Sequence, residues 1–375
     1  MPELVALDLP AGPGFVDALR AAWDDGDAVL PVDPRLPGPA VTDLLEVLRP
    51  SVVVDDSGRH RRPDGRPTEP GDALVIPTSG TTGRPKGVVL DRAAVEASAW
   101  ASSARLGVDP GSDRWVACLP LAHVGGLAVV TRALVTGTSC TVIPGFDVDT
   151  VERLAGEGAT LISLVTTALR RTDTSGYRAV LLGGAAPPDS RPGNVVTTYG
   201  MTETGSGVVY DGRALDGVEL RVGDGSTGQD GEVLVRGPML LRRYRDGSDP
   251  RLAGRWLPTG DSGRFGPDGR LVVFGRIAEV IVTGGEKVWP NQVEQLLTHH
   301  PGIDQVAVWK RSDPEWGERV VAWVVPVDPA RTPGLDELRD LVAVELPRWA
   351  APREVVVTDR LPRTSSGKVT RAALR

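Results

Sequence analysis

The segment PTSGTTGRPKGVVL, residues 77–90, decides how the fold and the chemistry of this chain are interpreted. Four hydroxyl side chains, three glycines and one lysine stand between Thr78 and Gly87, after one short apolar run and before another. A glycine- and hydroxyl-rich loop after a strand can bind phosphate, because its backbone N–H groups approach closely and its hydroxyls add donors. The segment therefore predicts an anion-binding loop, with a flexible surface turn as the alternative.

This segment does not fit the Walker phosphate loop, whose pattern is G-x-x-x-x-G-K-[ST]. Counted from Gly80, Pro85 occupies the position of the second glycine, and Gly87 replaces the Mg²⁺-binding hydroxyl after Lys86. Residues 88–90, VVL, favour a strand, whereas a helix follows the Walker loop. The loop therefore belongs to another class.

Strands and helices alternate from residue 73 onward, which predicts a mostly parallel sheet covered by helices on both faces. We expect Asp91 to cap a helix, and we expect a polar loop or a mobile connection over residues 55–72. After about residue 210, short strands with glycine-rich turns indicate a β-rich subdomain. The prediction is an α/β protein with a large N-terminal domain and a small α+β C-terminal domain.

The composition is typical of a soluble globular protein. Apolar residues make up 41% and charged residues 24% of the 375, and no apolar run approaches the roughly 20 residues that span a bilayer. A net charge of −7 disfavours a nucleic-acid partner, because such partners select a basic face. Cys118 and Cys140 lie in no metal or redox spacing, and the N-terminus lacks a secretory pattern, so we expect a cytoplasmic protein.

Lysine is scarce in this chain. Lys86, Lys287, Lys310 and Lys368 are the four lysines among 42 basic residues. Biased codon usage explains the scarcity, but arginine cannot replace a compact ammonium group everywhere. Each lysine is therefore a candidate functional residue.

TSGTTGRPKG resembles the signature loop of the adenylate-forming enzymes, which include acyl- and aryl-CoA ligases, luciferases and the adenylation domains of peptide synthetases. Further motifs of this family follow in order across residues 78–368: LPLAHVGG, LLGGAAPP, YGMTET, PTGD, FGR, VTGGEKVWPNQVE and LPRTSSGK. The first 70 residues carry little signal and are shorter than is usual in the family. The resemblance implies a large domain over residues 1–275, a hinge at 276–278 and a mobile C-terminal domain over 279–375.

The resemblance implies a reaction in two steps. A carboxylate attacks the α-phosphate of ATP to give an acyl-adenylate and pyrophosphate, and the thiol of coenzyme A then attacks the acyl carbon. The expected small molecules are a carboxylic acid, ATP, Mg²⁺ and coenzyme A. The sequence leaves a homodimer open.

The motifs carry over a set of ATP-binding residues. The loop that would hold the β- and γ-phosphates contributes Thr78, Ser79, Gly80, Thr81, Thr82, Gly83 and Lys86. The adenine and α-phosphate region contributes Gly184, Ala185, Tyr199, Gly200 and Thr202, with Glu203 as the Mg²⁺ ligand. Asp261 and Arg276 would hold the ribose, and Lys368 would bridge the carboxylate and the α-phosphate as the main catalytic residue.

Other motif positions are implied for the acid and for coenzyme A. The acid-binding set is His123, Gly126, Arg132, Gly200 and Met201, and the expected catalytic group comprises His123, Thr202, Glu203 and Lys368. Gly284, Gly285 and Glu286 would approach coenzyme A. At the hinge the chain has Ala278 where the family usually has Asp or Lys, which puts the kinetics of domain rotation in doubt.

The compact chain, the LPLAHVGGL motif, Arg132 and TGGEKVWP together resemble the o-succinylbenzoate–CoA ligases of menaquinone synthesis. An arginine in the pocket suits an aromatic dicarboxylate, whereas an Arg132 that faces solvent is the alternative. Another aryl- or acyl-CoA ligase, transfer to the thiol of a carrier protein, and a nucleotide-binding scaffold without chemistry also remain open. The intact set of Glu203, Asp261, Arg276 and Lys368 favours an enzyme over a scaffold.

Overall fold

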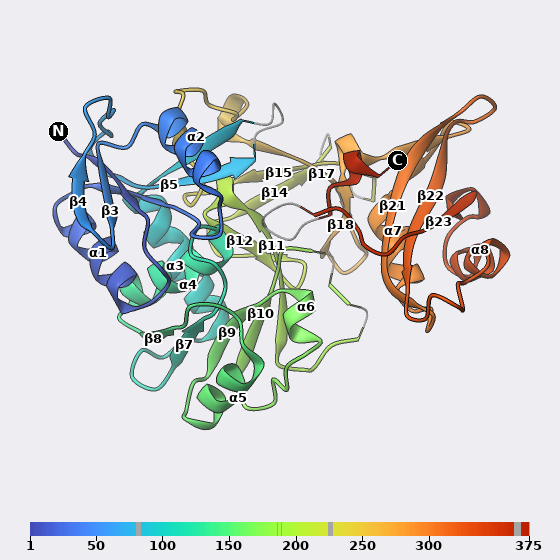
Figure 1. Ribbon diagram of the computed structural model, residues 1–375, viewed down its shortest axis with the longest axis horizontal. Helices are drawn as coiled ribbons and strands as arrows, with labels where there is room; N and C mark the ends of the chain where they lie inside the picture. Colours follow the sequence, from blue (N-terminus) through green and yellow to red (C-terminus); the bar gives the residue numbers. More distant parts are fainter. Residues whose placement is uncertain (80–83, 186, 189, 224–227, 364–368, 375) are drawn as a thin grey trace. The chain divides into compact units, whose positions relative to one another are not determined.

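The computed structural model describes residues 1–79, 84–185, 187–188, 190–223, 228–363 and 369–374 (Figure 1). The chain forms two compact units. The first comprises residues 1–220 and 235–257, and the second comprises residues 221–234 and 258–375. The domain boundary and the hinge expected at residues 276–278 stay predictions.

The first unit contains a seven-stranded sheet in the order β16-β6-β5-β2-β1-β3-β4. Its strands are β1 (Leu4–Leu7), β2 (Ala28–Pro31), β3 (Val52–Asp55), β4 (Gly58–Arg61), β5 (Asp72–Ser79), β6 (Pro85–Asp91) and β16 (Arg243–Tyr244). Strands β3, β1, β2 and β5 are parallel, whereas β4, β6 and β16 run antiparallel to their neighbours. The helices α1 (Pro13–Asp24) and α2 (Gly38–Leu48) precede β2 and β3.

The polar loop expected over residues 55–72 is wrong in part, because β4 pairs with β3 as a hairpin. All four side chains of β4 are exposed. An exposed strand without an apolar face gives no alternating pattern, which is the signal that a sequence offers for a strand. By contrast, the strand expected at residues 88–90 is confirmed as part of β6.

A second seven-stranded sheet has the order β13-β12-β11-β10-β9-β7-β8. Its strands are β7 (Arg114–Ala117), β8 (Ser139–Val142), β9 (Leu161–Leu164), β10 (Ala179–Leu182), β11 (Val195–Met201), β12 (Ser206–Tyr210) and β13 (Arg213–Ala214). The first five of these are parallel, as the alternation of elements predicts.

The α-helices described in this part of the first unit are α3 (Arg92–Leu106), α4 (Val124–Thr136), α5 (Val148–Gly156) and α6 (Thr166–Leu169). Helix α3 contacts β5 and β6 of the first sheet, β12 of the second sheet, and α4. The predicted cap of α3 is confirmed, since the Asp91 carboxylate accepts a hydrogen bond from the N–H of Ala94 at 2.8 Å. The two sheets are thus joined through buried helices.

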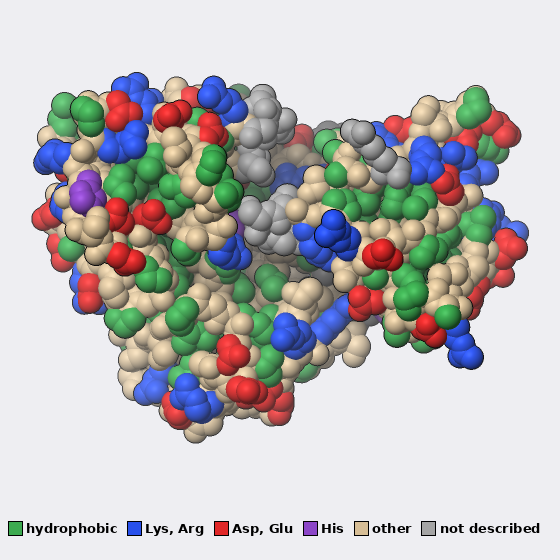
Figure 2. Space-filling model, viewed as in Figure 1, with side chains coloured by type: hydrophobic (Ala, Val, Ile, Leu, Met, Phe, Trp, Pro, Cys, Tyr) green, Lys and Arg blue, Asp and Glu red, His purple; other side chains and the backbone are tan. Residues whose placement is uncertain are grey.

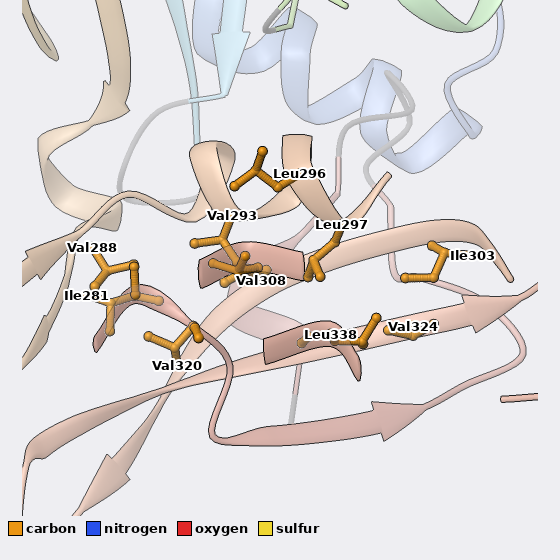
Figure 3. Packing of buried hydrophobic residues seen from close by; sticks show 14 residues of the cluster. Ile281, Val288, Val293, Leu296, Leu297, Ile303, Val308, Val320, Val324 and Leu338 are labelled. Atoms are coloured by element: carbon orange, nitrogen blue, oxygen red, sulfur yellow. The ribbon is translucent and has the colours of Figure 1, made fainter. Parts of the chain in front are cut away.

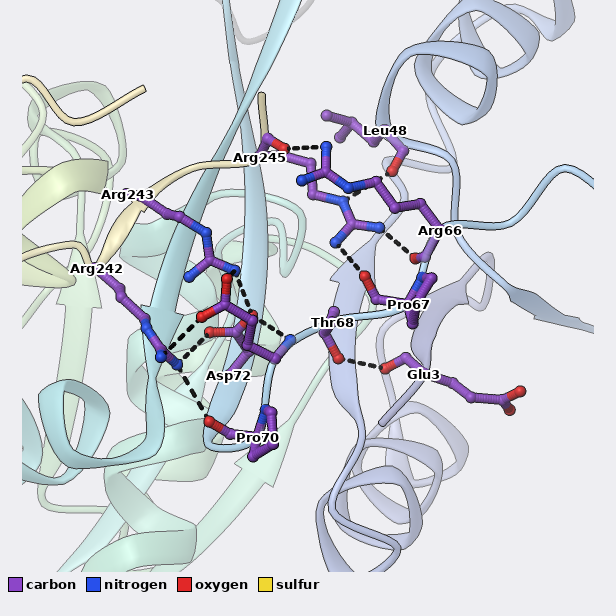
Figure 4. A network of polar contacts seen from close by, with 11 residues as sticks. Glu3, Leu48, Arg66, Pro67, Thr68, Pro70, Asp72, Arg242, Arg243 and Arg245 are labelled. Atoms are coloured by element: carbon purple, nitrogen blue, oxygen red, sulfur yellow. Dashed lines mark hydrogen bonds and ion pairs between the residues drawn. The ribbon is translucent and has the colours of Figure 1, made fainter. Parts of the chain in front are cut away.

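The arginines around β16 fix that short strand to the first sheet (Figure 4). Arg245 is buried and donates to the carbonyl oxygens of Pro67 at 2.9 Å and Leu48 at 3.2 Å. Burial lowers the pKa of Arg245 to about 10, so the guanidinium is still charged at neutral pH. Arg242 and Arg243 both pair with the buried carboxylate of Asp72.

The second unit contains most of a four-stranded sheet and all of a five-stranded sheet. The former has β14 (Glu219–Val222), β15 (Gly231–Arg236), β17 (Leu257–Phe265) and β18 (Leu271–Arg276). The latter has β19 (Ile281–Thr283), β20 (Glu286–Val288), β21 (Ile303–Asp313), β22 (Gly317–Pro326) and β23 (Glu354–Val357). The five-stranded sheet and the helices α7 (Pro290–Leu297) and α8 (Leu335–Ala343) form the α+β part that the predicted fold class includes. The four-stranded sheet, which the sequence predicts within the large domain over residues 1–275, falls mostly in this second unit.

One apolar cluster packs α7 and α8 against the five-stranded sheet (Figure 3). Leu297, Val308, Val324 and Leu338 are all fully buried in it.

Among the described residues, no helix combines the length and the apolar composition needed to span a bilayer. Acidic and basic side chains are interspersed on the face of the protein that Figure 2 shows.

Replacing Leu297 by alanine should lower the free energy of unfolding by about 2–5 kcal/mol, because a fully buried leucine leaves a cavity. Val344→Ala is the matched control, since Val344 is 79% exposed and should change stability by less than about 0.5 kcal/mol. Urea unfolding followed by tryptophan fluorescence measures both. Equal effects of the two substitutions would contradict this packing.

Candidate active site

The carboxyl ends of β7, β9, β10 and β11 lie at one edge of the second sheet, because these strands are parallel neighbours. The segments that follow three of them contain predicted site residues. His123 comes after β7, residues 184–185 come directly after β10, and residues 199–201 end β11. Ligands of open parallel sheets bind beyond the carboxyl ends of the strands, so this edge is the expected place for a small-molecule site.

Gly200 allows a close approach of two strands at this edge. A Cβ atom there would lie 2.1 Å from the carbonyl oxygen of Ser206 on β12, and the register shifts between Tyr199 and Gly200. The short helix η1 (Thr202–Thr204) follows directly, capped by the half-buried Met201. This short helix contains Thr202 and Glu203, whose contacts with a phosphate and a cation stay predictions.

The adenine-side residues 184–185 are exposed and follow β10. Gly184 has a φ of 86°, which favours glycine, so the turn after β10 needs this residue. Tyr199 is half-buried on β11. Their contact with adenine stays a prediction.

The predicted phosphate loop forms the connection of the β5–β6 hairpin. Thr78 pairs with Lys86 and Ser79 with Pro85 in the register of this hairpin, and the Thr78 hydroxyl donates to the Lys86 carbonyl oxygen at 3.4 Å. Gly80, Thr81, Thr82 and Gly83 lie outside the described residues. The hairpin brings the two ends of the loop to the same place, where Thr78 and Lys86 are adjacent.

Tyr244 connects two predicted site residues and was missed in the sequence. Its hydroxyl donates to Oε1 of Glu203 at 2.9 Å, and the ammonium of Lys86 lies 5.0 Å from the centroid of its ring. Burial and the nearby Glu203 raise the pKa of Tyr244, so its hydroxyl remains a donor at neutral pH. One of only four tyrosines, it stands in an arginine-rich run that gave no sign of this contact.

The donor set at Glu203 fits a cation that arrives with a nucleotide. Within the described part of the chain, no group of three or more His, Cys, Asp or Glu side chains could hold a metal ion. Mg²⁺ in nucleotide sites commonly takes one or two carboxylates, with phosphates and waters completing the octahedron. A single half-buried carboxylate whose Oε1 is oriented by Tyr244 suits that arrangement and does not suit a permanently bound metal.

Beside His123 lie the carboxylate of Asp33 and the guanidinium of Arg35, two groups that the sequence did not indicate as site residues. Asp33 follows β2 and is 5% exposed, and its two oxygens accept from Nε and Nη2 of Arg35 at 2.9 and 2.7 Å. Nη2 of Arg35 also lies 3.3 Å from Nε2 of His123, and Asp33 lies 3.6 Å from the same nitrogen. Both members of the pair therefore lie beside the same ring nitrogen, and their contacts orient the imidazole.

Arg132 does not face solvent, so that alternative is wrong. The residue is 2% exposed, its Nε donates to the Ser102 hydroxyl at 2.6 Å, and its guanidinium carbon lies 4.8 Å from the centroid of the Trp115 ring. The cavity that Arg132 helps to line has a volume of about 10 Å³, room for about one water. Contact with an acid would need rearrangement there, and the acid-binding role stays a prediction.

Gly126 lets the first turn of α4 approach the preceding segment. A Cβ atom at this position would lie 2.4 Å from the carbonyl oxygen of Pro120. The approach fixes the start of α4, for which His123 is the N-cap residue. The predicted acid-binding residues His123 and Gly126 therefore share one turn.

Within the second unit, the two predicted ribose-binding residues are cross-strand partners. Asp261 on β17 pairs with Arg276 on β18, and Oδ1 of the carboxylate lies 3.1 Å from Nε of the guanidinium. Arg276 also donates to the carbonyl oxygen of Thr259 at 2.8 Å. Asp261 is 6% exposed, so Arg276 holds a nearly buried carboxylate in place.

The predicted hinge and coenzyme A residues also lie in the second unit. Ala278 is exposed in the short helix η3 (Ile277–Glu279). Gly284 and Gly285 form the β19–β20 turn with φ values of 60° and 87°, and a Cβ atom at Gly284 would lie 2.7 Å from the Trp316 ring. Glu286 is exposed where β20 begins. Lys368 lies outside the described residues.

Arg371, three residues after Lys368, anchors the end of the described chain and was also missed. Its guanidinium binds Glu279 at 2.7 Å, Glu294 at 2.8 Å and Asn291 at 2.7 Å. Burial raises the pKa of Glu294 against the opposing effect of Arg371. The network ties the C-terminal segment to α7 and η3.

Comparison with known proteins gives matches over both units. A family model described as AMP-binding enzyme matches residues 55–245, and one described as AMP-binding enzyme C-terminal domain matches residues 292–368. A probable 2-succinylbenzoate–CoA ligase of Mycobacterium tuberculosis is 42% identical, covering 98% of this chain and 97% of that protein. A 2-succinylbenzoate–CoA ligase of Bacillus cytotoxicus is 33% identical, covering 80% of this chain and 69% of that protein.

Two solved structures of the o-succinylbenzoate coenzyme A synthetase of Bacillus subtilis are similar to this chain, each at 27% identity. The complex with the acyl-adenylate intermediate has a TM-score of 0.88, covering 100% of this chain and 88% of that one. The complex with ATP and magnesium ion has a TM-score of 0.86, covering 99% of this chain and 89% of that one. The predicted fold class is thereby confirmed.

Asp33→Asn should reduce the amount by which the stability of the protein decreases as the pH falls. The Arg35 hydrogen bonds hold the pKa of Asp33 below its usual range. A lowered pKa stabilises the fold above the unfolded-state value of about 3.9 and loses this contribution as pH falls through the folded-state value. Between about pH 6 and pH 3, the melting temperature of the wild type should therefore fall further than that of Asp33→Asn.

Thermal unfolding across this pH range measures the difference. Asp216→Asn is the control, because Asp216 is exposed in the same unit. Parallel pH profiles for the wild type and Asp33→Asn would show that the Asp33–Arg35 pair contributes nothing to the acid dependence.

Proposed function

This chain belongs to the AMP-binding enzyme family, and from that premise we propose that it is an ATP-dependent ligase that joins 2-succinylbenzoate to coenzyme A in menaquinone synthesis. The resemblance to adenylate-forming enzymes is confirmed by the same matches. The single observation that carries the proposed substrate is the 42% identity, over nearly the full length of both chains, to the mycobacterial relative with that name.

In the first step, a carboxylate oxygen of the acid attacks the α-phosphorus of ATP, and the bond from that phosphorus to the pyrophosphate oxygen breaks. Thr78 and Lys86 hold the leaving phosphates, since they are adjacent in the hairpin. Thr202 contacts the α-phosphate, and Glu203 binds Mg²⁺. Bound Mg²⁺ supplies neutralisation of the phosphate charge.

Two residues of the second unit hold the nucleoside in this proposal. The Asp261 carboxylate accepts hydrogen bonds from the ribose hydroxyls and is itself kept in place by Arg276. A carboxylate already fixed by a guanidinium loses little freedom when it binds a diol. Lys368 neutralises charge on the acid and the α-phosphate as the bond forms.

His123 orients the acid in this proposal. The Asp33–Arg35 pair contacts Nε2 of the imidazole, which sets the ring orientation. An imidazole with a fixed orientation places the attacking carboxylate with less loss of freedom than a mobile one. Arg132 contributes positive charge to the same wall.

In the second step, the sulfur of coenzyme A attacks the acyl carbon and AMP leaves. The incoming thiol passes the turn formed by Gly284, Gly285 and Glu286. The two glycines at the centre of this turn carry no side chains, which leaves space for the thiol. The two steps alternate by rotation at Ala278. The proposal includes a cytoplasmic location, and gel filtration decides between a monomer and a homodimer.

The purified protein should form an acyl-CoA from 2-succinylbenzoate, ATP, Mg²⁺ and coenzyme A, detected by mass. Among a panel of benzoates, aliphatic acids and 4-oxo-4-phenylbutanoate, which lacks the second carboxylate, 2-succinylbenzoate should give the highest kcat/KM. Lys368→Ala should lower the rate by about 100-fold or more, because it removes charge stabilisation at the reacting phosphate.

A different preferred acid would overturn the substrate while keeping the ligase. Product formation with a carrier protein but not with free coenzyme A would identify the other acceptor. If no acid of the panel promotes exchange between ATP and pyrophosphate, the enzyme proposal itself is wrong.

A further inference from the structure

We propose that Tyr244 is a positioning residue that holds the metal-binding carboxylate of Glu203 and the phosphate-binding ammonium of Lys86 in one fixed arrangement. The inference rests on the proposed function, which assigns these two groups to Mg²⁺ and to the nucleotide phosphates. Tyr244 then prepares the site to receive a magnesium nucleotide as a single ligand.

The two contacts of Tyr244 use different parts of its side chain. The hydroxyl donates to Oε1 of Glu203 at 2.9 Å, which is a hydrogen bond to a charged acceptor. The ring face lies 5.0 Å from the ammonium of Lys86, within the range of a cation–π contact. A substitution that removes only the hydroxyl therefore affects one partner directly, and a substitution that removes the ring affects both.

Tyr244 is held firmly enough to position its neighbours. Strand β16 pairs with β6, with Tyr244 opposite Val88, and the N–H of Tyr244 donates to the Ser248 carbonyl oxygen at 2.8 Å. On either side along the chain, Arg243 pairs with the buried Asp72 and Arg245 is buried against carbonyl oxygens (Figure 4). The strand that carries the ring is therefore anchored at both ends.

Glu203 is fixed from the backbone as well. Its carbonyl oxygen accepts from the N–H of Leu241 at 2.7 Å, three residues before Tyr244. The hydroxyl of Thr204 accepts from the N–H of Met201 at 2.9 Å, which holds the turn of η1. The backbone of Glu203 is consequently fixed, and Tyr244 sets the orientation of its carboxylate group.

Tyr244 also keeps two opposite charges available. Among the described residues, Lys86 and Glu203 form no direct ion pair, although each contacts the same tyrosine. Without the ring, the ammonium and the carboxylate could pair with each other, which would withdraw both from a ligand. The aromatic side chain orients each charge and keeps them separate.

Equilibrium binding of ATP by calorimetry, with EDTA or with Mg²⁺, tests this role. Tyr244→Phe should bind metal-free ATP within about twofold of the wild type, because the ring over Lys86 remains. It should bind magnesium ATP about tenfold more weakly, since the hydrogen bond that orients Glu203 is lost. Tyr244→Leu should also weaken the binding of metal-free ATP about threefold, because the ring over Lys86 is lost.

Tyr177→Phe is the matched control. Tyr177 is buried in the same unit, and its hydroxyl donates to the Val151 carbonyl oxygen at 2.7 Å, so the variant loses a comparable hydrogen bond. Both ATP affinities should match the wild type in this control. The Mg²⁺ concentration for half-maximal exchange between ATP and pyrophosphate should rise in Tyr244→Phe and stay constant in Tyr177→Phe.

Each outcome separates the inference from the proposed function. If the wild type makes an acyl-CoA but Tyr244→Phe binds both forms of ATP as the wild type does, Tyr244 has no positioning role. An equal weakening of both forms in Tyr244→Phe would assign the hydroxyl a structural role and also overturn the inference. If the wild type shows no acid-dependent use of ATP, the proposed function fails first.

Discussion

The antiparallel pairing of β6 with β5 on one side and β16 on the other is the constraint on which the candidate phosphate site depends. It places Thr78 beside Lys86, and it places Tyr244 on the neighbouring strand. Chain segments far apart in sequence are thereby held as one surface. The buried carboxylate of Asp72, paired with Arg242 and Arg243, secures this edge from the other end of β5.

The helix-joined sheets of the first unit explain how the remaining groups reach their places. Parallel strands end at a common edge, so the residues at the carboxyl ends of β7, β10 and β11 are brought together although they are far apart in sequence. The close packing at Gly200 and Gly126 leaves no space for a side chain. The second unit has its own apolar core, its own Asp261–Arg276 pair and its own anchored C-terminal segment.

Much of the fold followed from local sequence patterns, because the interactions that form these elements join residues that are close together in the sequence. The strand at residues 88–90 and the cap at Asp91 depend on neighbours within a few residues. The exposed strand β4 was missed, since its side chains carry no apolar alternation. Motif resemblance supplied the candidate residues, including the Asp261–Arg276 pair, but not Tyr244 or Arg35.

Several of the missed contacts are long-range. Tyr244 lies 41 residues from Glu203, and Arg35 lies 88 residues from His123, so no local pattern links them. The burial of Arg132 was equally invisible, because an arginine on an apolar helix face can extend to solvent or fold inward against Ser102 and Trp115. Such partners follow from the arrangement of strands and helices in space rather than from residue type.

The central claim is that this chain activates a carboxylic acid as its adenylate. A single turnover with enzyme in excess over ATP, with Mg²⁺ and 2-succinylbenzoate but without coenzyme A, tests it most directly. Mass spectrometry of the quenched mixture should show the acyl-adenylate and pyrophosphate in equal amounts. Formation of ADP and phosphate, or release of pyrophosphate that does not depend on the acid, would contradict the account.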